Sequence, residues 1–345
     1  MNQSLLYFPI SELREIYSRV DWSCLKGQPV LLTGGTGFLG RWLLETILYA
    51  NFYLDHKMDL TVISRNPDSF LYRFPNYKAF KNLKFLKADV KNLNQIAGDY
   101  FCVIHAAVES DSRLNPNSAI DTFETIIYGT KSVLELAASV GVKKFLFLSS
   151  GAVYGPFVEM KVEESSSASP PLQIQYTYGE SKRAAELLCR LYSEKFKIDM
   201  SIARCFSFVG PGIPLDKSYA IGNFIGNCLN NESIKIKGDG SPLRSYMYVV
   251  DLAAWLFSSL TKVVGFETFN VGSDEKISIL ELAKLVKEIG NNKNEISVEG
   301  IVNQKGTIDQ YIPSTEKIKN KLSLEMSYSL VKAIEKTIEF YRDKK

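Results

Sequence analysis

The fold of this chain is predicted by one stretch, Pro29-Val30-Leu31-Leu32-Thr33-Gly34-Gly35-Thr36-Gly37-Phe38-Leu39-Gly40. Its first five residues form an apolar run typical of a buried strand, and a helical pattern through Leu44 and Ile47 follows the last glycine. Glycines at this spacing let the backbone approach a pyrophosphate, whose charge the N-terminus of the next helix favours. The motif between a strand and a helix therefore indicates a dinucleotide site, and the alternative is a tight turn without a ligand.

Further apolar runs extend this alternation of strands and helices along the chain. Strands are predicted at Leu60–Ser64, Leu83–Ala88, Tyr100–His105, Lys144–Leu148 and Ile198–Cys205, with helices at Ile120–Val140 and from Tyr178 through about Arg190. The alternation predicts an α/β fold with a Rossmann-type doubly wound parallel sheet and a smaller α/β C-terminal substrate-binding region.

The predicted division has three parts, because the alternation loosens after the sixth strand. Residues 1–27 are an N-terminal extension that packs on the rest, with a helix from Ser11, as its N-cap, to about Val20. Residues 28–205 form the cofactor domain, to which 246–272 return. Residues 206–245 and 273–345 form the substrate-binding region.

Composition and charge exclude several classes of partner. The chain has 41 basic and 38 acidic residues, a net charge of +3, so no global field selects nucleic acid or an anionic membrane. No apolar run approaches the ~20 residues that span a bilayer, and the N-terminus does not resemble a secretory signal. Only His56 and His105 are histidines, which argues against a histidine-rich metal site. Five scattered cysteines, without a Cys-x-x-Cys pair, predict reduced thiols in a cytoplasmic protein.

The end of the second strand indicates which nicotinamide cofactor binds. NAD-binding folds tend to place an acid there for the ribose hydroxyls, whereas an arginine suits a 2′-phosphate. Here Ser64 and Arg65 follow the strand, so both are expected to contact that phosphate and NADP(H) is favoured over NAD(H). A solvent-facing Arg65 without a ligand is the alternative. Ala106 and Ala107, after the fourth strand, leave room for a cofactor ribose.

A tyrosine and a lysine four residues apart indicate proton transfer. Tyr178 and Lys182 share one face of the predicted helix, where the ammonium favours the phenolate form of the tyrosine. Such a tyrosine can exchange a proton with a sugar or steroid hydroxyl. An exposed helix pair without a catalytic role is the alternative.

This ordered set of motifs resembles the extended short-chain dehydrogenase/reductase superfamily, and more closely its NAD(P)-dependent nucleotide-sugar epimerase/dehydratase branch. The resemblance covers nearly the whole chain from about residue 28. It implies catalytic roles for Ser150, Tyr178 and Lys182. It implies cofactor contacts from Gly34, Thr36, Gly37, Phe38, Leu39, Gly40, Asp89, Val90, Tyr178 and Lys182, and substrate contacts from Ser150, Ser207 and Arg244.

Departures from the family pattern narrow the expected reaction. Gly151 and Ala152 stand where 4,6-dehydratases carry an acidic pair, so dehydration would lack its acid and base. Ser207 replaces an asparagine that commonly binds diphosphate, and Ile126 replaces another asparagine. For Arg244, the alternative to gripping a diphosphate is an ion pair with a nearby acid.

The resemblance implies an enzyme that transfers hydride at C4 of a nucleotide-diphosphate sugar. An NADPH-linked 4-keto reductase is favoured, because a consumed reductant is typically the phosphorylated cofactor. A 4-epimerase with bound NAD uses the same three residues and is the alternative. A non-catalytic cofactor-binding scaffold is disfavoured, since those usually lose the tyrosine or the lysine. The resemblance also implies a homodimer through the helices at 120–140 and 176–196.

Overall fold

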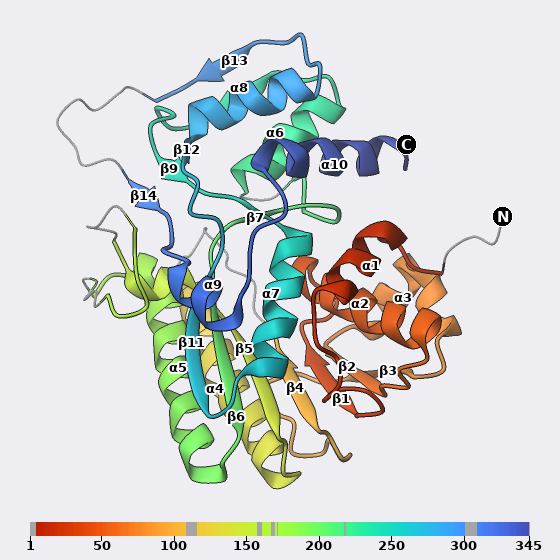
Figure 1. Cartoon of the computed structure of the whole chain (residues 1–345). Coiled ribbons are helices and arrows are strands. Elements are labelled where there is room, and N and C mark those ends of the chain that lie inside the picture. Colours follow the sequence, from red (N-terminus) through yellow and green to blue (C-terminus); the bar gives the residue numbers. More distant parts are fainter. Residues whose placement is uncertain are drawn as a thin grey trace. The chain divides into compact units, whose positions relative to one another are not determined.

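The computed structural model describes residues 5–107, 116–156, 161–166, 170, 172–216, 219–300 and 309–344 (Figure 1). The chain forms two compact units. The first unit comprises residues 1–155, 169–204 and 253–269, and the second comprises 156–168, 205–252 and 270–345.

A seven-stranded sheet of order β11-β6-β5-β4-β1-β2-β3 is the centre of the first unit. Its strands are β1 (Val30–Thr33), β2 (Leu60–Ser64), β3 (Leu83–Lys87), β4 (Cys102–His105), β5 (Lys144–Ser150), β6 (Asp199–Cys205) and β11 (Phe266–Val271). The pairs β1–β2, β1–β4, β2–β3 and β4–β5 are parallel. Six of the strands follow the doubly wound order 3-2-1-4-5-6, so the predicted Rossmann-type sheet is confirmed. The order reverses between β1 and β4, where such sheets bind their ligands.

The helices of the first unit follow the predicted alternation. They are α1 (Ile10–Ser18), α2 (Phe38–Leu54), α3 (Pro67–Arg73), α4 (Pro116–Ser139) and α5 (Thr177–Phe196), with short 3-10 helices at η1 (Pro75–Ala79), η2 (Gly151–Tyr154) and η3 (Ile174–Tyr176). Helix α4 packs along α5, as Figure 1 also shows. Their apolar faces cover Val103, Phe145 and Phe147 of the sheet, all at most 1% exposed. Burial of such side chains, at about 1.5–3 kcal/mol each, stabilises this layer.

The N-terminal residues belong to the first unit, and their helix begins at another residue than predicted. The carbonyl of Pro9 accepts the first helical hydrogen bonds, from the N–H groups of Glu12 and Leu13, so Ser11 is not the N-cap. The prediction of Ser11 as N-cap was wrong because Pro9, two residues earlier, is the residue whose carbonyl accepts the first helical hydrogen bonds. Leu13 and Ile16 are fully buried.

A buried carboxylate fastens the extension to α2. The Glu45 side chain, 0% exposed, accepts hydrogen bonds from the backbone N–H groups of Tyr7 and Phe8 and from the Tyr77 hydroxyl. Phe8 also stacks on Trp42, with ring centroids 4.1 Å apart. Burial raises the pKa of Glu45, although the hydrogen bonds and the charge of Arg41 oppose that rise. Removing those donors would leave a buried charge without compensation.

The described part of the second unit contains four complete helices and several short strands. The helices are α6 (Ala220–Leu229), α8 (Ile279–Ile289), α9 (Glu316–Leu322) and α10 (Leu330–Arg342), and α7 (Val249–Lys262) runs from this unit into the first. The strands are β7 (Phe208–Val209), β8 (Ile234–Ile236), β9 (Leu243–Arg244), β10 (Met247–Tyr248), β12 (Ile277–Ser278), β13 (Ile296–Val298) and β14 (Gln310–Tyr311). Helices α6, α8 and α10 pack on one another. Asn270 fastens residues 161–166, since its N–H donates to Glu164 and its amide to the Val162 carbonyl.

Candidate active site

The glycine loop lies between β1 and α2, at the point where the strand order reverses. Gly34 has φ +73°, and a Cβ there would lie 2.4 Å from the Ala106 carbonyl oxygen. A Cβ on Gly40 would lie 2.1 Å from the Gly34 carbonyl oxygen. These two glycines are therefore required by the packing of the protein itself.

Gly37 differs from the other two, because the protein hardly crowds it. A Cβ at Gly37 would meet only the Gly34 carbonyl oxygen, at 3.4 Å. Gly37 is the N-cap of α2, and no side chain in the described part of the chain caps that helix end. The uncrowded glycine and the uncapped N–H groups of α2 fit a pyrophosphate that approaches the backbone closely. The cradle therefore suits the dinucleotide that the sequence predicts.

The other predicted cofactor residues lie at the ends of neighbouring strands. Arg65 follows β2 with an exposed side chain, and the Ser64 hydroxyl accepts from the Asn66 N–H at 3.3 Å. Asp89 is exposed after β3, whereas Val90 is buried in the core. The remaining predicted cofactor residues are partly buried; they are Thr36, Phe38, Leu39, Ala106 and Ala107. Parallel strands present these ends at one edge of the sheet.

Tyr178 and Lys182 lie one turn apart on α5, as predicted. The Lys182 side chain is buried, and its Nζ donates to the Leu148 carbonyl of β5 at 2.8 Å. Its Nζ also lies 4.8 Å from the Phe147 ring centroid and 5.9 Å from that of Tyr178. Tyr178 is partly buried against the core of the first unit. The lysine is therefore held against the sheet beside the tyrosine ring, which an exposed helix pair would not be.

Ser150 ends β5 and caps η2. Its hydroxyl, in a residue that is 8% exposed, accepts from the Ala152 N–H at 3.2 Å. Gly179 lets α5 approach this turn, since a Cβ there would lie 2.2 Å from the Ala152 carbonyl oxygen. The residue next to Tyr178 thus sets the distance between the tyrosine helix and the serine turn.

Three positions that depart from the family pattern are buried or partly buried. Gly151 is buried in η2, and Ala152 is partly buried beside α5. Ile126 is 1% exposed and packs in the core with Val90, so an asparagine there would be buried among apolar side chains. Neither Gly151 nor Ala152 can donate or accept a proton.

His105 is a packed residue at the end of β4. It is 2% exposed and hydrogen-bonds through Nδ1 to the Thr33 hydroxyl (2.7 Å) and through Nε2 to the Thr130 hydroxyl (3.2 Å). Burial, together with the charge of Lys182, lowers its pKa to about 3. The ring is therefore neutral at pH 7 with both nitrogens engaged, which does not suit a base or a ligand.

Of the three predicted substrate residues, Ser207 and Arg244 belong to the second unit. The Arg244 Nη2 lies 2.6 Å from Oδ2 of Asp309, so the ion-pair alternative is present in this structure. Asp309 is largely exposed, at 65% of its side chain. Ser207 is partly buried after β6, and its carbonyl accepts from the Met247 N–H at 3.0 Å.

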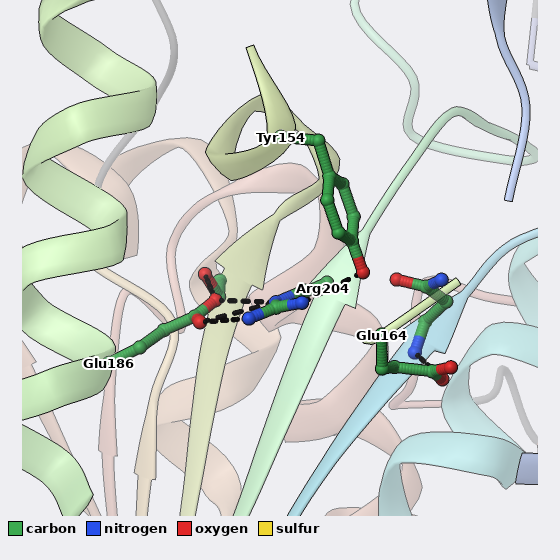
Figure 2. Close-up of polar contacts among 6 residues, drawn as sticks. Tyr154, Glu164, Glu186 and Arg204 are labelled. Carbon is green, nitrogen blue, oxygen red and sulfur yellow. Dashed lines mark hydrogen bonds and ion pairs between the residues drawn. The ribbon is translucent and has the colours of Figure 1, made fainter. Parts of the chain in front are cut away.

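A buried ion pair beside the serine turn was not predicted from the sequence. Figure 2 shows the Arg204 guanidinium between the Glu186 carboxylate and the Tyr154 hydroxyl. Glu186 lies four residues after Lys182, and this spacing, which places both on one face of the helix, was the one sequence signal for Glu186. Its partner is 18 positions away on β6, a separation that local patterns do not reveal.

The described residues contain no group of His, Cys, Asp and Glu side chains arranged to hold a metal ion. Among the helices of the described chain, none is long and apolar enough to cross a bilayer.

The chain is similar in sequence and in fold to known proteins. UDP-glucuronic acid decarboxylase 2 of Arabidopsis thaliana is 28% identical over 330 residues, covering 92% of this chain and 69% of the relative. Human dTDP-D-glucose 4,6-dehydratase is 26% identical over 327 residues, covering 91% of this chain and 90% of the relative. The crystal structure of a Bacillus cereus UDP-glucuronic acid 4-epimerase, with UDP-glucuronic acid and NAD, has the same fold. Its TM-score is 0.76 at 22% identity, covering 92% of this chain and 100% of that chain.

The sequence profile described as "NAD dependent epimerase/dehydratase family" matches residues 30–272. This range runs from β1 through the glycine loop and the Tyr178 helix to the end of β11. The resemblance to extended short-chain dehydrogenases/reductases is thereby confirmed. The chain is an enzyme of that type and belongs to the NAD dependent epimerase/dehydratase family.

Proposed function

We propose that the enzyme transfers hydride at C4 of a nucleotide-diphosphate sugar, and that it reduces a 4-keto group with NADPH. The observation that carries the proposal is the combination at α5 and η2. Ser150, Tyr178 and Lys182 are present, while the neighbouring Gly151 and Ala152 have no ionisable side chain. Proton exchange with a C4 oxygen is then available, whereas loss of water from the sugar has no acid or base.

Each residue has one role in the proposed reaction. A bound nicotinamide cofactor supplies the hydride. The Tyr178 hydroxyl gives its proton to the C4 oxygen, and the nearby Lys182 ammonium favours the phenolate that remains. The Ser150 hydroxyl orients the sugar oxygen. Arg244 exchanges the exposed Asp309 for the substrate diphosphate, to which its guanidinium offers two parallel hydrogen bonds.

A 4-epimerase with tightly bound NAD is the second candidate. A 4-epimerase of similar fold, that of Bacillus cereus, holds UDP-glucuronic acid and NAD in one complex, which favours this reading. Arg65 favours the reductase, because its exposed guanidinium suits a 2′-phosphate. The cofactor released from the purified, denatured protein separates the two. Stoichiometric NAD supports the epimerase, and an empty site that takes up NADPH supports the reductase.

We also propose a homodimer in the cytoplasm. The outer faces of α4 and α5 expose large apolar side chains at Ile120, Phe123, Tyr128, Leu187 and Leu191, each between 45% and 61% exposed. Two such helix pairs can cover each other in a symmetric interface. The mass in solution, measured by light scattering, tests the proposed homodimer.

The proposed cytoplasmic location rests on the cysteines. They are scattered and form no Cys-x-x-Cys pair, which supports a reducing compartment.

Tyr178→Phe tests the proposed reaction. The variant lacks the proton donor, so kcat should fall at least about 100-fold while the Kd for NADPH stays within about twofold. Turnover of 4-keto nucleotide sugars and fluorescence of bound NADPH measure the two quantities. Tyr192→Phe, later on the same helix, is the matched control and should retain activity. A fully active Tyr178→Phe enzyme would sink the assignment.

A further inference from the structure

Three successive turns of α5 contact the end of β5 and the turn that follows it. Gly179 packs against the Ala152 carbonyl, Lys182 Nζ donates to the Leu148 carbonyl, and Glu186 accepts from the Ser149 hydroxyl at 2.5 Å. Lys182 and Glu186 thus hold consecutive strand residues from consecutive helical turns. Ser150, whose hydroxyl caps η2, is the next residue along the strand.

Arg204 connects the same helix to the far end of η2. Its Nε lies 3.1 and 3.2 Å from the two Glu186 oxygens, and its Nη2 donates to Oε2 at 2.7 Å. Its Nη1 donates to the Tyr154 hydroxyl at 2.8 Å, and its Cζ lies 4.8 Å from that ring centroid. Burial opposes the charge on Arg204, but the hydrogen bonds and charge of Glu186 raise its pKa above the ordinary value. The guanidinium is therefore charged at every working pH.

The cluster encloses the catalytic serine turn. Ser149 precedes Ser150, and Tyr154 ends the 3-10 turn that Ser150 begins; both are 3% exposed. Glu186 is 7% exposed. A buried ion pair is weak evidence for stability, because desolvation offsets much of the attraction. The Arg204 guanidinium, however, hydrogen-bonds to both α5 and η2 and so fixes their relative position. The contacts tie the Ser150 turn and the Tyr178–Lys182 helix into one unit.

We propose that Glu186 and Arg204 are positioning residues for hydride transfer. Through Ser149 and Tyr154 they hold the Ser150 hydroxyl in register with Tyr178 and Lys182. This inference rests on the proposed function for its kinetic consequence. Small misplacements of reacting groups can cost about 100-fold in rate, so the loss should appear in kcat more than in KM.

Single variants that remove one hydroxyl test the role without removing a charge. Ser149→Ala and Tyr154→Phe should each lower kcat about 10-fold, with KM and the Kd for NADPH within about twofold. The matched controls are Ser193→Ala, whose hydroxyl donates to the Ile198 carbonyl of the same unit, and Tyr192→Phe, later on α5. If the controls lose as much kcat as the test variants, the inference is overturned.

Charge-removing variants separate positioning from stability. Arg204→Lys keeps the charge but cannot reach both Glu186 oxygens and Tyr154. Its kcat should therefore stay below that of the wild-type enzyme. The pair Glu186→Met with Arg204→Met removes both charges together and should recover the thermal midpoint better than either single change, while kcat stays low. Recovery of kcat together with the midpoint, or full activity of Arg204→Lys, would mean a structural role alone and overturn the inference.

Hydrogen exchange gives a readout that needs no substrate. In Ser149→Ala and Tyr154→Phe, amides in 148–155 and 177–187 should exchange faster than in the wild-type enzyme, and those in α2 should not. If the wild-type enzyme turns over no 4-keto sugar but the two variants show this local pattern, the proposed function fails and the positioning contact stands. Unchanged exchange in both segments overturns the positioning role whatever the activity.

Discussion

Arg65 follows β2 with an exposed side chain, and the proposed preference for NADP(H) rests on its charge. Arg65→Asp should shift the ratio of Kd values for NADP(H) and NAD(H) toward NAD(H) by about 10- to 100-fold. The reason is that a charge-assisted hydrogen bond of about 1.5–3 kcal/mol to the 2′-phosphate is replaced by repulsion. Fluorescence titration with both reduced cofactors measures the ratio.

A matched control is Arg73→Asp, which makes the same change of net charge on the exposed last turn of α3. It should leave the cofactor ratio unchanged. If both substitutions act equally, the preference comes from the general field of the protein. If neither acts, Arg65 is a surface residue without a cofactor contact.

The sequence allowed prediction of those candidate site residues that lie within a few positions of one another in the chain. The glycine spacing and the Tyr178–Lys182 pair are local, so short patterns display them. The ion pair of Arg244 with Asp309 joins residues 65 positions apart, and a pattern could offer it only as an alternative. The Glu186–Arg204 pair escaped notice for the same reason.

At the scale of the element, Gly179 sets the approach of α5 to η2. Gly179→Ala places a Cβ against the Ala152 carbonyl, where 2.2 Å is far inside contact distance. We expect a loss of about 1–3 kcal/mol in the free energy of unfolding and at least a 10-fold fall in kcat, since the serine turn must move. Urea unfolding and steady-state kinetics measure both effects.

Gly238→Ala is the control for this glycine, because its Cβ would meet nothing within 4 Å. It should leave stability and kcat near the wild-type values. Wild-type kinetics in Gly179→Ala would show that the helix and the turn adjust without consequence for the site.

The strands of the central sheet were predicted from the sequence because buried parallel strands are continuous apolar runs. β1, β4 and β5 are buried at every residue. Two-residue strands such as β9, β12 and β14 carry no such pattern, since pairing with distant segments alone defines them. The short helices α3 and α9 were missed because seven residues show too little periodicity.

At the scale of the whole molecule, buried His105 makes stability depend on pH. Its pKa of about 3 in the folded protein lies below the ordinary value of about 6.5. Below pH 6.5 the unfolded chain therefore binds a proton that the folded chain does not. The stability contributed by the neutral ring is complete above that pH and falls by about 1.4 kcal/mol per unit as pH drops toward 3.

His105→Asn removes this dependence while keeping a polar group near Thr33 and Thr130. The difference in unfolding free energy between wild-type and variant should shrink by about 2 kcal/mol from pH 6.5 to pH 5. Urea titrations at several pH values measure it, and other titrating groups cancel in the difference. A difference that stays constant across this range contradicts the prediction.

The contact of Tyr7 and Phe8 with Glu45 bears on how this protein can be shortened or tagged. The family match begins at residue 30, and an expression design cut there would discard the two N–H groups that hold a buried carboxylate on α2. That helix begins at the glycine loop, so the damage would reach the cofactor cradle. A boundary drawn from family similarity alone would therefore fall inside the folded body of the enzyme.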